Sequence, residues 1–315
     1  MSGQKNDRVP LILDVDTGID DTIALAFAVN APECDLIAVT TLAGNVGVDK
    51  TTRNTLDVLG VLGANHIPVH RGASRPLVRP HRDAVYYHDV NGLGGAALPR
   101  TDRPLGVDRG PAAIIRLAKE RPGEVVLVCV GPLTNLAIAL NVAPELGGLL
   151  RAVVVMGGAF TVPGNTVPWA EFNFLVDPEA AQQVFAAGLP NLTVVGLDVT
   201  HKVWLDRETW DAARALATNP QKAPAAWLAA TVYAKEFARA EQARTYLHDP
   251  LAVAVALDPT LVGYEDAAIA IETAEGREGA TSITGPGPVK VALSVDRERF
   301  RDIVRERLGV RSGRA

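Results

Sequence analysis

Short apolar runs alternate with segments of helical periodicity along the first two thirds of the chain. The runs are rich in Val, Ile and Leu and are continuous and not alternating in polarity, which is typical of strands covered on both faces. We expect such strands at 9–16, 34–42, 124–130, 150–158 and 191–198. Their alternation with helices predicts an α/β fold built on a mostly parallel sheet with helices on both faces.

Helical periodicity covers much of the remaining chain. Helices are expected at 19–30 and 48–63, and a third begins near Leu133. The last third is more helical than the rest. We expect its helices at 206–216, 220–240, 249–257 and 295–309, with candidate strands near 267–273 and 288–294.

The longest irregular region is the Pro-, Gly- and Arg-rich stretch 71–110. It contains the segment YYHDVNGLGG, whose aromatic and histidine residues suit a binding loop better than a spacer between domains. Because the chain shows no repeat and no linker-like break, we expect one domain, residues 1–315, with an open Rossmann-like central sheet.

Composition narrows the classes of partner. The chain has 315 residues, 48% of them hydrophobic, and a formal net charge of -5. This mild acidity gives no electrostatic reason to expect a nucleic-acid or membrane partner. The N-terminus lacks a signal-peptide core and no stretch is long enough to span a bilayer, so the cytoplasm is the expected location. Cys34 and Cys129 lie in separate apolar runs and are expected to be free core thiols.

Four carboxylates gather where the first strand meets the first helix. Asp14 and Asp16 stand at the end of the strand and share one face. Asp20 and Asp21 fall in the first helical turn, where the dipole favours an anion by only about 0.3–1 kcal/mol each. That gain does not offset the repulsion among four carboxylates, and no Lys or Arg lies in this stretch. Helix capping explains Asp20 alone, whereas the whole cluster indicates a hard divalent ion, Ca²⁺ or Mg²⁺.

Other ion and phosphate motifs fail on spacing. An EF-hand loop counted from Asp14 needs a bidentate glutamate at its twelfth place, which is Leu25 here. The two-aspartate phosphatase motif needs Thr or Val where this chain has Gly18. The segment GPLTN lacks the lysine of a phosphate-binding loop, and GLGG does not follow a strand.

The segment DVDTGIDD resembles the N-terminal signature DxDxGxDD of the inosine-uridine-preferring nucleoside hydrolase family. Further segments recur in the family's order and extend the resemblance from about residue 9 to about residue 260: LAGNVG, VGPLTNLA, VVMGGAF, GNTVPWAEFNFLVDPEAA and LHDPLAVAVAL. The resemblance implies a Ca²⁺-dependent enzyme that splits a ribonucleoside into ribose and free base.

The resemblance also implies roles for individual residues. The side chains of Asp16, Asp21 and Asp249 would bind Ca²⁺ together with the backbone carbonyl of Val130, and Asp14 would orient its neighbours. The residues implied to contact the substrate are Asp20, Asn45, His88, Asn165, Glu171 and Asn173.

The chemistry of glycosidic cleavage agrees with this set. The bond to a nucleobase breaks through an oxocarbenium-like sugar and needs a nucleophilic water. Ca²⁺ lowers the pKa of a bound water, and Asp16 would take the proton of that metal-bound water as general base. Carboxylate and amide oxygens stabilise the developing cation. Direct attack by water should then invert the anomeric centre.

Activation of the leaving base is expected to depend on histidine. His248 lies beside Asp249 and would donate a proton near pH 7; a structural His–Asp hydrogen-bonding pair is the alternative. His88 matches a loop that the family uses near the nucleobase, in which members often have Gly where this chain has Asp89. No role is assigned to the remaining histidines, His66, His70, His81 and His201.

Several other polar and aromatic residues have structural explanations. Asn135 is expected to cap the helix after the third strand and is left out of the site. Glu171 and Asn173 are expected to lie on one side of an extended stretch, where they could bind a diol. Tyr233 and Phe237 are four residues apart on a predicted helix; they could stack on a base, but we expect them to face the core.

Two other functions remain open from the sequence. The same fold and ion could serve a hydrolase of another N-ribosyl compound, or the chain could be a non-catalytic nucleoside or ribose sensor. Retention of Asp16 argues against the sensor, because binding alone needs no general base. The tryptophans lie outside the base loop around His88, which favours an enzyme not restricted to purines. The resemblance further implies a homo-oligomer, a dimer or a tetramer.

Overall fold

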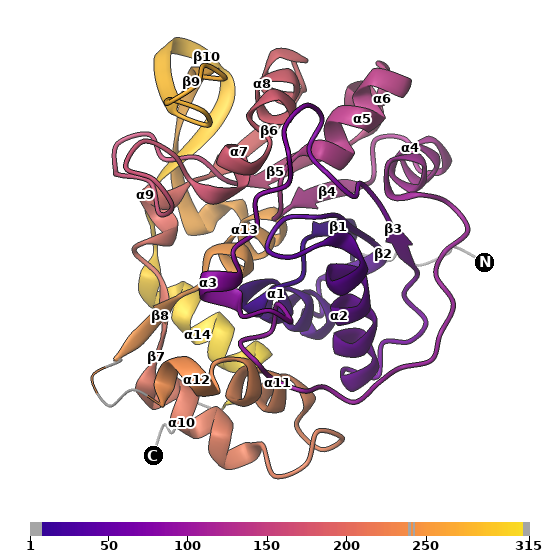
Figure 1. Cartoon of the computed structure of the whole chain (residues 1–315), viewed down its shortest axis with the longest axis vertical. Coiled ribbons are helices and arrows are strands. Elements are labelled where there is room, and N and C mark those ends of the chain that lie inside the picture. The colour runs from indigo at the N-terminus through magenta and orange to yellow at the C-terminus, as the bar shows by residue number, and fades with distance from the viewer. Residues whose placement is uncertain (1–7, 239–240, 242, 311–315) are drawn as a thin grey trace, which may run out of the picture.

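The structure, a computed structural model, describes residues 8–238, 241 and 243–310. An eight-stranded sheet lies at the centre of the fold, with its strands in the order β3-β2-β1-β4-β5-β6-β10-β9 (Figure 1). The strands are β1 (Val9–Val15), β2 (Cys34–Thr41), β3 (Val69–Arg71), β4 (Val126–Cys129), β5 (Ala152–Met156), β6 (Leu192–Val195), β9 (Val262–Ile271) and β10 (Thr281–Val295).

Neighbouring strands of this sheet are parallel except for β9, which runs antiparallel to β10. The predicted fold class is therefore confirmed, and the five strands expected in the first two thirds are β1, β2, β4, β5 and β6. The chain passes outward from β1 through β2 to β3 and then returns to place β4 on the other side of β1. Open parallel sheets bind ligands outside the carboxyl ends of the strands at such a switch point.

Helices cover both faces of the sheet (Figure 1). Successive residues of β1 contribute to two separate cores, Leu11 and Leu13 to one and Ile12 to the other, which explains the continuous apolar pattern of the strands. The first core is closed by α1 (Ile19–Asn30), α2 (Val48–Val61), α13 (His248–Leu257) and α14 (Arg297–Arg307), and the second by α4 (Gly110–Glu120), α5 (Thr134–Val142), α6 (Leu146–Leu149) and α8 (Pro178–Ala186).

The prediction of one helix at 220–240 is wrong. Two shorter helices stand there, α11 (Pro224–Val232) and α12 (Ala234–Phe237), separated by Tyr233 at φ −92° and ψ 2°. Residues 239 and 240, at the end of the predicted helix, lie outside the described residues.

The second of these helices, α12, makes tertiary contacts with α10. The ring of Phe237 stacks on Trp210 of α10 (Arg207–Leu216), with ring centroids 4.9 Å apart. The Phe237 carbonyl also accepts a hydrogen bond from Nη2 of Arg207 at 3.0 Å. These contacts hold α12 on α10, and no apolar periodicity along one segment encodes them.

The remaining elements are short pieces that the sequence pattern did not predict. Strands β9 and β10 are also longer than the expected segments 267–273 and 288–294. No helix among the described residues combines the length and the apolar character needed to cross a membrane. The short pieces are α3 (Val85–His88), α7 (Phe172–Val176), α9 (Leu197–Thr200), the 3₁₀ turn η1 (Pro259–Leu261) and the antiparallel pair β7 (Trp204–Asp206) and β8 (Arg244–Tyr246).

Candidate active site

The acidic residues of the sequence lie at the switch point of the sheet. Asp16 directly follows β1, and Val130 directly follows β4, the parallel neighbour of β1. The N–H of Val130 donates to the carbonyl of Asp14 at 2.9 Å, which holds the two strand ends together. The structure therefore brings the first acidic segment and the predicted carbonyl ligand to one place.

The turn into α1 wraps around the carboxylate of Asp21. This carboxylate accepts from the backbone N–H of Asp16 at 3.1 Å and of Gly18 at 2.8 Å, as an N-terminal acid of a helix should. The side-chain amide of Asn45 also donates to it at 3.2 Å. Asp21 is thus fixed by the turn and by a residue from the loop after β2.

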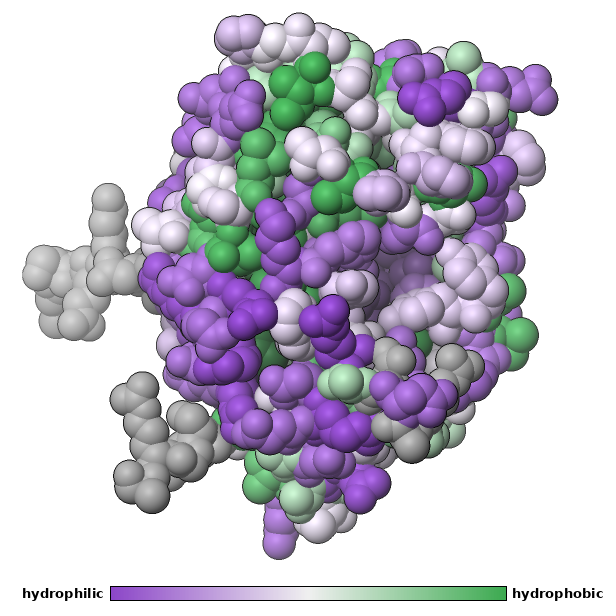
Figure 2. Space-filling view, turned by 90° about the vertical axis from the view of Figure 1, so that its left-hand side faces the viewer, coloured by the Kyte–Doolittle hydropathy of each residue, from purple (hydrophilic) through white to green (hydrophobic). Residues whose placement is uncertain are grey.

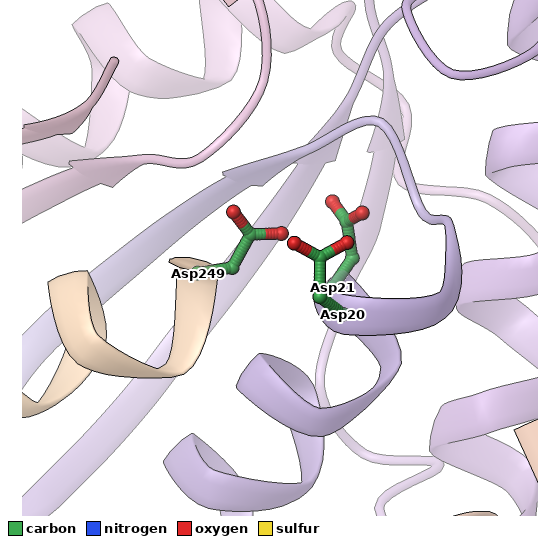
Figure 3. Close-up of side chains that lie close together, drawn as sticks. All are labelled: Asp20, Asp21 and Asp249. Carbon is green, nitrogen blue, oxygen red and sulfur yellow. The ribbon is translucent and has the colours of Figure 1, made fainter. Parts of the chain in front are cut away.

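Three carboxylates from two helices converge above this turn. Oxygens of Asp20, Asp21 and Asp249 all lie within 4.8 Å of one another. Figure 3 shows Asp20 and Asp21 on the first turn of α1 and Asp249 on the first turn of α13, with their carboxylates facing each other. This group contains Asp20, which the sequence placed among the substrate contacts, and not Asp16, which it placed among the metal ligands.

Asp16 lies beside this group and is 1% exposed. Its Oδ2 accepts from the N–H of Asn45 at 2.7 Å, whereas its Oδ1 is a buried atom with no hydrogen-bond partner among the described residues. The close approach requires glycine at position 44, because a Cβ there would stand 2.0 Å from Oδ2 of Asp16. One oxygen of Asp16 is thus held by Asn45, and the other is buried without a hydrogen-bond partner among the described residues.

Burial and mutual repulsion raise the pKa of these carboxyls. Desolvation, followed by the charge of Asp21, raises the pKa of Asp20 to about 8. Desolvation and then Asp21 also raise the pKa of Asp16, and desolvation and then Asp20 raise that of Asp249. A cation would reverse this penalty, and oxygen donors are the ligands that hard divalent ions prefer. The residues present therefore fit a metal ion.

Asp14 is fully buried below Asp16, in a polar cluster of its own. Its Oδ1 accepts from the hydroxyl of Thr40 and from the amide of Asn135 at 2.7 Å. Asn135 also donates to the carbonyl of Thr41 at 3.2 Å, and its Oδ1 accepts from the N–H of Ala73 at 2.9 Å. The prediction that Asn135 caps a helix is wrong: α5 has Leu133 at its N-cap, and Asn135 holds Asp14 instead.

A pocket of about 290 Å³ opens above the carboxylates. Figure 2 views the side of the molecule that carries α3 and β8, and the surface is hollowed there. None of the described residues that line the pocket is a tryptophan. The predicted site residues on its wall are Asp20, Asn45, His88, Val130, Asn165, Glu171, Asn173, His248 and Asp249.

Two of the predicted histidines, His88 and His248, line this pocket. Nδ1 of His88 accepts from the N–H of Ile19 at 3.1 Å, so its ring proton is on Nε2. Nδ1 of His248 lies 2.8 Å from the hydroxyl of Thr200. Burial lowers the pKa of each imidazole to about 3, with the neighbouring imidazole of His201 adding to the effect on His248. Burial therefore favours the neutral form of both rings, and the proton donation expected of His248 stays a prediction.

Comparison with known proteins identifies the family. A family model described as inosine-uridine preferring nucleoside hydrolase matches residues 11–302. The non-specific ribonucleoside hydrolase RihC of Escherichia coli O139:H28 is 40% identical over 315 residues, covering 97% of this chain and 100% of the relative. The chain belongs to the inosine-uridine preferring nucleoside hydrolase family.

Solved structures of nucleoside hydrolases have the same fold. The plant nucleoside hydrolase PpNRh1 superposes with a TM-score of 0.87 at 34% identity, over 95% of this chain and 98% of that one. The purine-preferring ribonucleoside hydrolase from Gardnerella vaginalis gives a TM-score of 0.87 at 33% identity, over 96% and 98% of the two chains. The predictions of the family and of an enzyme are confirmed.

The segment that contains Glu171 and Asn173 has a different conformation from the one expected. The stretch around Glu171 and Asn173 is not extended, because Glu171 is the N-cap of the short helix α7. Its carboxylate accepts from the N–H groups of Asn173 at 2.9 Å, Phe174 at 3.2 Å and Gly158 at 3.1 Å. Burial outweighs these bonds and raises the pKa of Glu171 to about 7. Capping, not strand alternation, brings both residues to the pocket.

The amide of Asn173 reaches the predicted carbonyl ligand. Its Nδ2 donates to the carbonyl of Val130 at 2.9 Å and to that of Met156 at 3.2 Å. Asn165 stands at the rim, is exposed, and accepts from the N–H of Phe172 at 3.0 Å. Asn173 therefore links the ends of β4 and β5 below the pocket.

Sequence reasoning did not assign every residue that lines the pocket, and His201 and Tyr246 are two that lie beside His248. Their rings are 4.8 Å apart at 35°, and the ring centroids of both lie within 5.8 Å of that of His248. His201 follows α9 and Tyr246 ends β8, elements that no periodicity indicated. The one available signal was the position of Tyr246, two residues before His248. Tyr233 and Phe237 are buried, as expected.

Proposed function

We propose that this chain hydrolyses the N-glycosidic bond of ribonucleosides in a Ca²⁺-dependent reaction, giving ribose and free base. The observation that supports this most directly is the group of Asp20, Asp21 and Asp249 oxygens within 4.8 Å, next to the unpartnered Oδ1 of Asp16. Family membership supports the reaction class, since relatives are named ribonucleoside hydrolases.

The metal site that we propose consists of Asp16, Asp21, Asp249 and the carbonyl oxygen of Val130. Asp20 is close enough to its neighbours to contribute as well. All of these donors are oxygens, which favours Ca²⁺ or Mg²⁺ over softer ions, and the family resemblance selects Ca²⁺. When bound, the ion would supply positive charge that lowers the pKa of a coordinated water and binds ribose hydroxyls.

We propose Asp16 as the general base. Its Oδ2 is held by the N–H of Asn45, and its Oδ1 has no partner among the described residues, so that this oxygen can accept a proton from water. Asp14 and Asn135 are hydrogen-bonded to each other and, like Asp16 and Asp21, are not among the described residues that line the pocket. Their part would be to hold the end of β1 in place.

The ribose would lie between the carboxylates and α7. Asn45, Asn173 and Glu171 line this part of the pocket, and Asn165 lies at its rim. Amide and carboxylate groups bind vicinal hydroxyls and stabilise positive charge that develops on the sugar in the transition state.

The base would lie in the outer part of the pocket near His88 and His248. Burial favours the neutral form of both imidazoles, and a neutral imidazole can donate one N–H hydrogen bond to a leaving base. We propose that hydrogen bonding of this kind, and not transfer from an imidazolium, assists departure of the base. With no tryptophan among the described lining residues, and a relative named non-specific at 40% identity, we propose a substrate range that includes both purines and pyrimidines.

A panel assay tests the proposal. Purified protein with Ca²⁺ should release reducing sugar from uridine and inosine, and cytidine and adenosine define its range. Binding of these nucleosides without release of sugar would support the sensor and refute the enzyme. Activity only on another N-ribosyl compound would refute the substrate class. The 2′-deoxynucleosides serve as controls, since they lack a hydroxyl that the proposed site binds.

Three further features remain predictions. A single domain over residues 1–315 agrees with the one large sheet and predicts a single cooperative unfolding transition. A dimer or tetramer is expected from the family resemblance and can be measured by light scattering. The cytoplasmic location stays a proposal and can be tested by fractionation of cells.

A further inference from the structure

The loop that carries His88 contains a residue in an unusual backbone conformation. Asp89, directly after α3, has φ 64° and ψ 169°. This region of backbone space is almost restricted to glycine, because a Cβ is crowded there. An aspartate that keeps this conformation must be held by contacts that glycine could not make.

The side chain of Asp89 makes two such contacts. Its Oδ1 accepts from the N–H of Val90 at 2.7 Å, and its Oδ2 accepts from Nζ of Lys235 at 2.6 Å. The first contact is local, whereas the second crosses 146 positions of sequence to the short helix α12. Asp89 therefore joins the loop after α3 to α12.

A second contact runs alongside the first. The hydroxyl of Tyr87 donates to Oε1 of Glu236 at 2.7 Å and lies 3.2 Å from the hydroxyl of Thr245 on β8. Tyr87 and Asp89 flank His88, and their partners Lys235 and Glu236 are consecutive. We call these two pairs, Asp89–Lys235 and Tyr87–Glu236, the loop clasp.

The loop clasp acts on His88, which lies between its two loop residues. His88 is buried against the start of α1, where its Nδ1 accepts from Ile19 and where a Cβ on Gly18 would stand 2.5 Å from this nitrogen. A small displacement of the loop would therefore break the hydrogen bond or move the ring. Because the Nε2–H is the remaining donor of the ring, its direction depends on the position of the loop.

We propose that Asp89 and Lys235 are positioning residues that hold the His88 loop over the base end of the pocket and so set the affinity for the nucleobase. This inference rests on the proposed function for the identity of the ligand. The Lys235 side chain is 70% exposed and that of Asp89 27% exposed, so the pair is weak and sensitive to salt. Glycine at position 89 would relieve the backbone conformation but remove the link to α12.

Steady-state kinetics with uridine and inosine test the inference in the Ca²⁺-loaded full chain. Asp89→Gly and Lys235→Met should each raise KM by about two- to fivefold, the range of an exposed ion pair, and leave kcat within twofold. The double variant should be no worse than either single variant, and Lys235→Arg should restore most of the affinity. Raising NaCl from about 20 to 500 mM should increase KM of the unchanged protein but not of the variants.

A matched control is Lys119→Met, which removes a surface ion pair with Glu145 (2.9 Å) outside the pocket. Its KM should be unchanged. Additive effects of the two clasp substitutions, or an unchanged KM in both single variants, would overturn the inference. A fall in kcat with constant KM would do the same, because a general loss of active protein would then explain it.

Hydrogen exchange separates failure of the clasp from failure of the proposed function. The N–H of Gly92 donates to the carbonyl of Asp89, and that of Gly94 to the carbonyl of His88. Without any substrate, these amides should exchange faster in Asp89→Gly and Lys235→Met than in Lys119→Met. If the unchanged protein hydrolyses no nucleoside, the proposed function fails and the exchange rates alone decide whether the clasp exists. Identical exchange in all proteins would show that it does not.

Discussion

Replacing Asp16 by asparagine should separate catalysis from folding. Asparagine has the same shape as aspartate and keeps an oxygen to accept the 2.7 Å hydrogen bond from Asn45. The substitution removes the negative charge and the available Oδ1, which has no partner among the described residues. We therefore expect the side chain to stay in place while the proposed general base is lost.

The magnitude follows from these contacts. Positioned general bases contribute about 10²–10⁴-fold, so kcat should fall by that factor, equivalent to about 3–5 kcal/mol of barrier. Exchanging a hydrogen bond to a charged acceptor for one to a neutral acceptor costs about 1 kcal/mol of stability. The repulsion of Asp16 by Asp21 and Asp20 is relieved at the same time, since their charges raise its pKa. Without calcium, the net change in stability should be small.

The assay pairs release of reducing sugar at saturating uridine with thermal unfolding in calcium-free buffer. Asp57→Asn is the control, because Asp57 is also buried but pairs with Arg53 and Arg100 outside the pocket. It should lose stability and keep kcat. An Asp16→Asn protein with kcat within tenfold of the unchanged enzyme and the same unfolding midpoint would refute the assignment. Should this variant not fold, Gly44→Ala displaces the same carboxylate, and unchanged kcat there would also refute it.

Three other predictions concern the ion, the leaving base and the core thiols. EGTA should lower the temperature midpoint of unfolding, and added Ca²⁺ should restore it. An ion that binds only the folded chain adds about 2.7 kcal/mol to the free energy of unfolding at 100 times its Kd. A midpoint that no divalent ion changes would contradict the metal site. Thr200→Val removes the 2.8 Å contact to His248 and should lower kcat. The nucleosides should rank by the size of this loss in the same order as they do for His248→Ala, whereas an effect on KM alone would count against base activation. Burial raises the pKa of Cys34 to about 12, so at pH 8 the native chain should react with thiol reagents roughly a thousandfold more slowly than the unfolded chain, and rapid labelling of the native protein would show that the thiol is accessible.

The sequence was sufficient to predict those parts of the fold and the site that depend on residues close together in the chain. The apolar runs predict the parallel strands, and the position of Asp14 and Asp16 at a strand end predicts that they lie at the ligand-binding edge of the sheet. Asp21 could be assigned in the same way, since it opens the helix that follows. Asp249 is different: it comes close to Asp21 only because α13 packs beside α1, and family resemblance alone indicated it.

The errors occurred where a local rule competed with a contact from elsewhere in the chain. Glu171 and Asn173 fit strand alternation, but the carboxylate of Glu171 accepts hydrogen bonds from the N–H groups that begin a helix. Tyr233 fits an uninterrupted helix, but its backbone, at φ −92° and ψ 2°, divides the segment into two shorter helices. Neither a capping contact nor the conformation of one residue is encoded in the periodicity of apolar positions.

Asn135 shows how such a residue could have been found. It opens the helix α5 that follows β4, the strand paired with β1, and parallel neighbours end at the same edge of a sheet, so a polar side chain at the start of that helix lies within reach of the carboxylates that end β1. Its amide has both donors and an acceptor, and it uses them on Asp14, Thr41 and Ala73. A helix cap would satisfy only its acceptor and leave the buried Nδ2 without a partner. The choice between a capping role and a place in the site therefore depends on which position gives hydrogen-bond partners to both the oxygen and the nitrogen of the amide. The pairing of neighbouring strands indicates that position.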